Sequence, residues 1–67
     1  MPSDAERLAK LLPHWMGHNA EHADEFRQWA ERAHAIGYAA AAAAIVRAAE
    51  ALLQANAELD QATRALE

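Results

Sequence analysis

The chain has 67 residues, a formal net charge of −4 at pH 7 and no cysteine. A chain this short forms one small domain, which excludes enzymes that need two lobes or a deep cleft of their own. The missing cysteines exclude a disulfide framework and a thiolate metal site. The acidic balance opposes binding to nucleic acid and to anionic membranes, so we expect neither as a partner.

The composition predicts an all-α fold. Alanine supplies 20 of the 36 hydrophobic residues, so only 16 larger apolar side chains can build a core. Alanine has the highest helix propensity, and two glycines and two prolines leave few breaks. The sequence shows no signal peptide and no apolar run long enough for a membrane span. We therefore expect one cytoplasmic helical domain over residues 1–67.

Capping and breaking residues predict where the helices begin and end. Ser3 is followed three residues later by Glu6, as in the capping box that starts a helix. Pro13 lacks a backbone N–H and disfavours helical geometry at the residue before it, so we expect a short helix at about 3–12 and a second at about 13–35. Gly37 suits a helix-ending position, which predicts a turn near 37 and a last helix at about 38–66.

The last predicted helix has the regular spacing of a bundle helix. Apolar or small residues recur in alternating steps of four and three, which places them along one inward-facing line. These residues are Tyr38, Ala42, Ile45, Ala49, Leu52, Asn56, Leu59, Thr63 and Leu66.

The preceding helix carries two neighbouring stripes with a seven-residue repeat. We expect both to face inward and Met16 and Gly17 to face outward, which makes the inner face aromatic with a polar gap at Asn19 and His22. The first stripe is Leu8, Trp15, His22, Trp29 and Ile36, and the second is Leu12, Asn19, Phe26 and Ala33.

Folding the two long helices back about Gly37 brings the polar interruptions together. With equal rise in both helices, residues whose numbers add to about 74 lie at the same height. Asn56 then lies opposite His18, beside the polar gap. A single hairpin leaves Phe26 and Trp29 partly uncovered, so we predict a homodimer that forms a four-helix bundle.

His14, His18 and His22 are spaced four residues apart, so neighbouring imidazoles stand above one another on one helix and can share a metal ion. The outer pair is about 12 Å apart along the axis, so further ligands are needed. Imidazole ligands favour Zn, Ni, Co or Cu(II) over Ca or Mg. Further ligands or supporting residues are the same histidines of a second chain, or Glu21, Glu25, Asn56 and Asp60.

A metal-free alternative explains the same residues. His18, Asn19, His22 and Asn56 can form a polar layer that hydrogen-bonds internally and sets the register of a helical dimerisation or adaptor module. The H-x-x-E-H pattern at residues 18–22 also occurs in a group of zinc peptidases, but those enzymes need a much larger domain. A haem held between histidines of two chains needs a cavity where the tryptophans pack. We expect no enzymatic activity, because no nucleophile is paired with a base.

The sequence also resembles a known family. The stretch 11–30 reads L-L-P-H-W-x-x-H-N-x-x-H-x-x-x-F-x-x-W-A, and Glu50 and the tripeptide Ala55–Asn56–Ala57 follow on the last helix. This pattern resembles an uncharacterised family of small bacterial and archaeal helical-hairpin domains with an H-W-x-x-H-N-x-x-H core, over about residues 5–66. The resemblance supplies a pattern without an activity. From the histidine spacing we predict a small protein that binds a divalent transition metal (Ni, Co or Zn) and handles nickel, cobalt or zinc.

Overall fold

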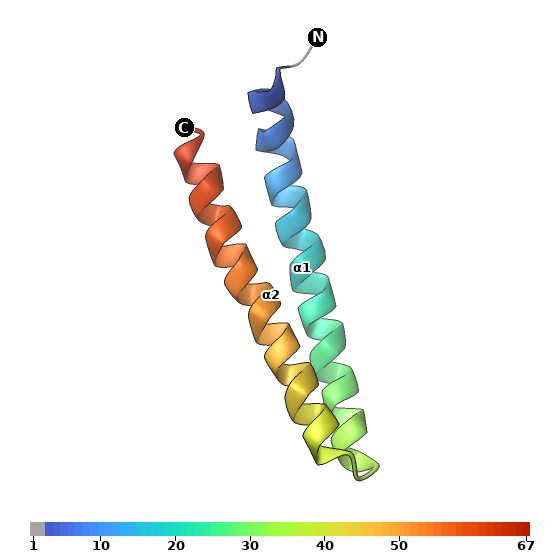
Figure 1. The fold of residues 1–67 in the computed structure, drawn as a ribbon. Coiled ribbons are helices and arrows are strands. Elements are labelled where there is room, and N and C mark those ends of the chain that lie inside the picture. The colour runs from blue at the N-terminus through green and yellow to red at the C-terminus, as the bar shows by residue number, and fades with distance from the viewer. Residues whose placement is uncertain (1–2) are drawn as a thin grey trace.

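The computed structural model describes residues 3–67, which form two antiparallel helices joined by a short turn (Figure 1). Helix α1 spans Asp4–Ala35 and helix α2 spans Ala39–Ala65. The predicted all-α helical hairpin is confirmed. Neither helix has a stretch that is both long and apolar enough to cross a membrane, within the residues that the structure describes.

The predicted break at Pro13 is wrong, because α1 continues through it without interruption. Proline removes the hydrogen bond that its N–H would donate to the carbonyl four residues earlier, here that of Ala9. Pro13 and Ala9 both lie at exposed positions, so water can donate a hydrogen bond to the free Ala9 carbonyl. The N-terminal cap is confirmed, since the Ser3 hydroxyl accepts a 3.2 Å hydrogen bond from the backbone N–H of Glu6.

The turn is built around Gly37, as predicted. Gly37 has a φ of 96°, in the left-handed region that favours glycine. The Tyr38 N–H donates to the Ala33 carbonyl at 2.9 Å, and the Gly37 N–H donates to the His34 carbonyl at 3.1 Å. This pair of bonds is a Schellman motif, which satisfies the last carbonyls of α1 and reverses the chain.

The inner face of α2 agrees with its predicted line, while that of α1 agrees with only one of its two predicted stripes. Seven of the nine predicted α2 residues, Ala42 to Thr63, are buried or half-buried, whereas the terminal Tyr38 and Leu66 are exposed. On α1 the second stripe faces inward as expected. Three further inward residues, Met16, Ala23 and Ala30, alternate with those of the second stripe in steps of four and three. The inner face of α1 therefore consists of Leu12, Met16, Asn19, Ala23, Phe26, Ala30 and Ala33.

The first stripe lies outside the hairpin, which corrects the expectation that it faces inward. Trp15 is 41% exposed, Trp29 58% and Ile36 72%, and Leu8 and His22 are exposed as well. The guanidinium carbon of Arg32 lies 4.7 Å from the centre of the Trp29 ring, a cation–π contact. We call Leu8, Trp15, His22, Trp29 and Ile36 the outer stripe.

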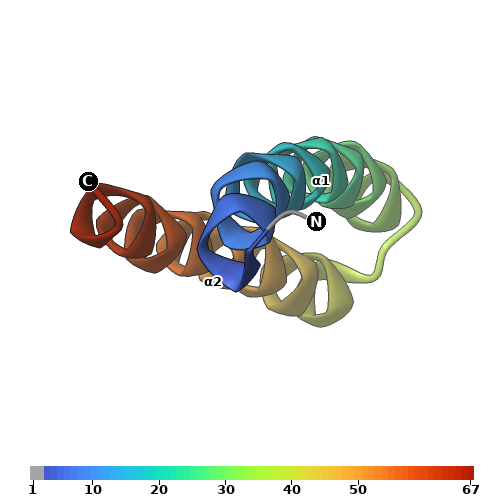
Figure 2. The ribbon, with the colours of Figure 1, turned by 90° about the horizontal axis from the view of Figure 1, so that it is seen from above.

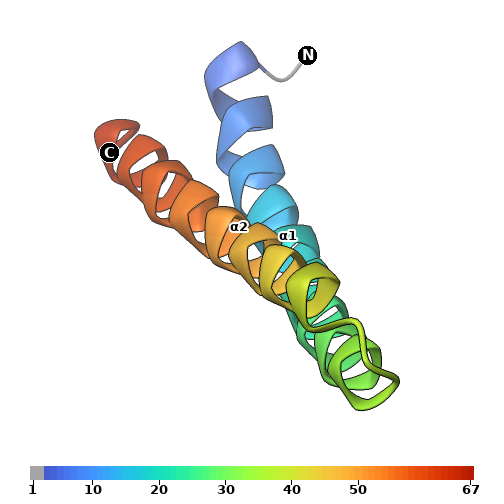
Figure 3. The same cartoon turned by 60° about the horizontal axis from the view of Figure 1, so that its bottom comes forward.

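The two helices diverge from the turn towards the chain ends, and Figure 3 shows the wide end at the termini. Seen from above, they also cross at an angle (Figure 2). Near the turn the buried residues are alanines, among them Ala30 and Ala42, whereas Leu12 and Leu59 lie between the helices farther away. Because the distance between packed helices depends on the side chains at the contact, this change of size accounts for the taper.

The hairpin is thin for its mass. Its only buried hydrophobic residues, among those described, are Leu12 and four alanines. Its Cα radius of gyration is 15.6 Å, compared with about 11 Å for a compact domain of this length. The chain exposes 5083 Å², about 900 Å² more than the roughly 4200 Å² that a compact protein of 7.3 kDa exposes.

Candidate functional site: the histidine groove

His14, His18 and His22 lie on three successive turns of α1, and all three side chains are exposed. The ring centres of His14 and His18 are 4.7 Å apart, and those of His18 and His22 are 6.1 Å apart. His18 therefore belongs to both neighbouring pairs. No hydrogen bond or ion pair within residues 3–67 involves any of the three rings.

These spacings suit two imidazoles on one metal ion. With metal–nitrogen bonds of about 2.0–2.1 Å and tetrahedral angles, two bound rings have centres about 5 Å apart. The two observed distances lie on either side of this value, so a small rotation of the side chains adapts either pair. Exposed imidazoles also need no opening of the fold before a metal can reach them.

The three rings line one side of an open groove with a volume of about 580 Å³. Trp15, Asn19 and, from α2, Leu59 complete its lining. Its lining residues come from the stretch 14–22 of α1 and from residue 59 of α2, which lie in the half of the hairpin where the two ribbons diverge (Figure 1). The divergence therefore leaves the histidines open to solvent on the side that faces the end of α2.

The other predicted ligands do not join the histidines. Glu21 and Glu25 are exposed and lie outside the lining of the groove. Asp60 forms an ion pair with Arg64, with 3.1 Å between the Arg64 Nε and the Asp60 Oδ2. In the described part of the chain, no group of three or more histidine, aspartate or glutamate side chains is arranged to hold a metal ion. One chain thus offers a pair of imidazoles.

Asn56 lies at the polar gap, as predicted, but its contacts differ from those expected. The Asn19 Nδ2 donates a 3.0 Å hydrogen bond to the Asn56 Oδ1, and the Asn56 Nδ2 donates a 2.9 Å bond to the Met16 carbonyl. Both bonds are partly buried. The polar layer therefore consists of two asparagines and a backbone carbonyl, and neither His18 nor His22 takes part.

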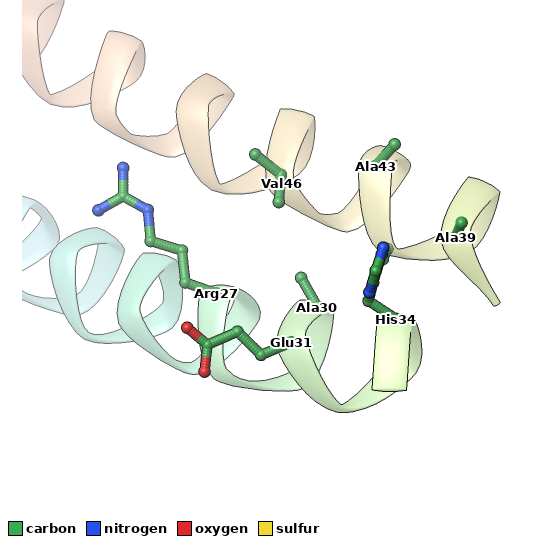
Figure 4. Close-up of a pocket in the computed structure, with 8 residues that line it drawn as sticks. Arg27, Ala30, Glu31, His34, Ala39, Ala43 and Val46 are labelled. Carbon is green, nitrogen blue, oxygen red and sulfur yellow. The ribbon is translucent and has the colours of Figure 1, made fainter. Parts of the chain in front are cut away.

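Two further hollows lie elsewhere on the hairpin. One of about 320 Å³ is lined only by Phe26, Trp29, Ile45 and Ala48, so it is apolar. The other, of about 480 Å³, lies near the turn, where the His34 ring extends towards the start of α2 (Figure 4). His34 is twelve residues from His22 and is not part of the groove.

Sequence reasoning missed Met16, Trp15 and Leu59 as parts of this region. Met16 was expected to face outward, yet it is half-buried and its carbonyl anchors Asn56. The alternating steps of four and three that run from Leu12 through Met16 to Asn19 were a usable signal. Leu59 was correctly expected on the inner line of α2, but its place in the groove depends on the divergence of the helices.

No curated protein and no solved structure matches this chain. The model of one family, described as a domain of unknown function (DUF8180), matches residues 8–66. The expected resemblance to an uncharacterised family is thereby confirmed, and the chain belongs to the DUF8180 family.

Proposed function

We propose that this chain is a small helical protein that binds a divalent transition metal, namely nickel, cobalt or zinc, through His14, His18 and His22. The observation that carries the proposal is the stack of three exposed imidazoles with ring centres 4.7 and 6.1 Å apart. The Asn19–Asn56 bond already fills the polar gap between the helices. The histidines are therefore not needed to satisfy buried polar groups, which leaves them available for a ligand.

A second candidate is a metal-free module that dimerises or joins other helical proteins. It is favoured by the exposed outer stripe and by the asparagine pair, because one polar contact in an apolar helix interface fixes register. In this reading Asn19 and Asn56 set the register without the histidines.

The deciding experiment measures thermal unfolding of chelator-treated protein without a histidine tag, with and without Zn, Ni or Co. A ligand that binds only the folded state at a hundredfold excess over its Kd stabilises it by about 2.7 kcal/mol, which gives a large rise in Tm for a domain of this size. We expect such a rise in the unmodified protein. His18→Ala should abolish it, because His18 belongs to both neighbouring pairs.

His14→Ala and His22→Ala each leave one neighbouring pair and should reduce the rise in Tm. His34→Ala is the matched control, since it removes an exposed histidine of the same helix that lies outside the groove. An unchanged Tm with all three metals would reject the metal proposal and leave the metal-free module as the better account. A rise that His34→Ala abolishes would place the ligands elsewhere.

A further inference from the structure

The outer stripe has the same order of residue types in both directions along α1. Its order is an aliphatic residue, a tryptophan, a histidine, a tryptophan and an aliphatic residue, each seven positions from the next, with His22 at the centre. Contacts across a two-fold axis pair residue i with residue j and j with i, so a surface that binds its own copy must be self-complementary. A stripe that is symmetric about its midpoint meets this condition for two antiparallel helices.

We infer that a second copy of this chain covers the outer stripe, with the two α1 helices antiparallel and the two-fold axis passing beside His22. Residues whose numbers add to 44 then lie at the same height, because both helices rise equally per residue. Trp15 faces the partner's Trp29, and Leu8 faces the partner's Ile36. The two His22 rings meet at the axis.

The surface around the stripe has room for this partner. The apolar hollow of about 320 Å³ lies beside Trp29, where it can receive the partner's Trp15. The groove of about 580 Å³ lies beside Trp15, where it can receive the partner's Trp29. On α2, Ala48 lines the hollow with Trp29 and belongs to a seven-residue repeat of small side chains on this face: Ala41, Ala48, Ala55 and Ala62.

The exposed area leaves room for an interface of ordinary size. The whole chain exposes 5083 Å², about 900 Å² more than a compact protein of its mass, so covering a standard interface of about 800 Å² on each partner would bring its exposed area close to that of a compact protein. The outer stripe carries no charged residue. A second copy is thus the occupant that matches both the area and the symmetry.

This dimer would add ligands to the metal site, a consequence that rests on the proposed function. Each chain brings His22 to the axis, and the two His18 residues lie one turn away on opposite sides of it, about 12 Å apart along the helices, so they cannot share one ion. The two His22 rings and one His18 ring can, and three imidazoles leave one position of a tetrahedral metal open. Glu25 lies about 1.5 Å in height from the partner's His18, since their numbers add to 43, and its carboxylate can orient that ring.

The test uses single cysteines, because the chain has none of its own. Each variant is oxidised with diamide in the presence of a chelator, so that no metal contributes to pairing. His22→Cys should form a disulfide with itself roughly a hundredfold faster than the exposed Arg47→Cys control, because pairing within a complex provides millimolar effective concentrations.

A mixture of the Leu8→Cys and Ile36→Cys variants should form the mixed disulfide, while each alone stays reduced. Self-pairing of Leu8→Cys would indicate parallel α1 helices and would overturn the inference. So would a dimer that forms none of these disulfides, or a monomer at micromolar concentration in sedimentation equilibrium of the unmodified protein. Dimer pairing as expected, with no effect of metal on Tm, would uphold the interface and reject the proposed function.

Discussion

Asn56 is the residue that ties the open half of the hairpin together. Its carboxamide accepts from Asn19 and donates to the Met16 carbonyl, so a single side chain joins a side chain and the backbone of α1. The other residues of the two inner faces near it, such as Ala23, Leu52 and Leu59, have apolar side chains that make no directional contact. A directional contact at this position therefore selects one axial alignment of the two helices.

Removal of this contact should lower stability measurably. We expect Asn56→Ala to decrease the free energy of unfolding by about 1–2 kcal/mol, since two partly buried hydrogen bonds are lost and their partners are left to water. Urea denaturation followed by circular dichroism measures this change. Gln54→Ala, at an exposed position of the same helix, is the control and should stay within about 0.5 kcal/mol. Equal effects of the two substitutions would contradict the role of Asn56.

At the scale of the helices, the two glycines have opposite roles. Gly17 lies inside α1, where an added Cβ meets nothing within 4 Å. Gly37 is equally uncrowded, but its φ of 96° is a conformation that residues with a Cβ rarely adopt. Space is thus the same at both positions, and only the backbone conformation differs.

The same substitution should therefore change stability in opposite directions. Gly17→Ala should raise the free energy of unfolding by about 1 kcal/mol, because alanine is the better helix former. Gly37→Ala should lower it by about 1 kcal/mol or more, because a Cβ in the left-handed region is unfavourable. Thermal melts of both variants at one protein concentration test this pair. A loss of stability in Gly17→Ala would show that Gly17 contacts another molecule.

The sequence predicted the hairpin because its strongest signals are local. Gly37 by itself indicates where α1 ends, because glycine readily adopts the left-handed conformation of that position. The alternating line from Ala42 to Thr63 indicates the inner face of α2 without any information about the partner helix. The break at Pro13 was wrong because the cost of proline depends on whether the freed carbonyl is buried, which the sequence does not contain. In α1 the exposed position of Pro13 decided the outcome.

The inward face of α1 was harder to predict than that of α2. The two predicted stripes of α1 lie only about 40° apart around the helix axis, and large apolar side chains outweigh alanines in any hydrophobic pattern. Trp15 and Trp29 therefore suggested an inner face that Ala23 and Ala30 occupy. The sequence was sufficient to predict that the three histidines lie on successive turns of one helix. The groove could not be predicted, because it depends on how far apart the helices lie at Leu59.

For the whole molecule, stability and association should be linked. Among the residues described, a single hairpin buries five hydrophobic residues, and four of them are alanines. Most of its larger apolar side chains need a second surface to be covered. In the proposed dimer, folding would draw on the same contacts as association.

We therefore expect the Tm to rise with protein concentration between low micromolar and millimolar solutions. Trp29→Gln should lower the Tm and weaken this dependence, because Trp29 is the more exposed of the two tryptophans in the outer stripe. Arg47→Gln, at an exposed position of α2 outside the stripe, should preserve both. Differential scanning calorimetry over a dilution series provides the measurement. A Tm independent of concentration would mean that the hairpin is stable alone.

The taper of the hairpin has a consequence for the shape of the proposed dimer. Each chain is a wedge, narrow at the turn and broad at the termini (Figure 1). Two wedges laid side by side in opposite directions make a bar of even thickness, since the thin end of one rests against the thick end of the other. His22 lies near the midpoint of α1, so the bar is little longer than the 53 Å of one hairpin. Doubling the mass would thus thicken the particle and leave its length almost unchanged.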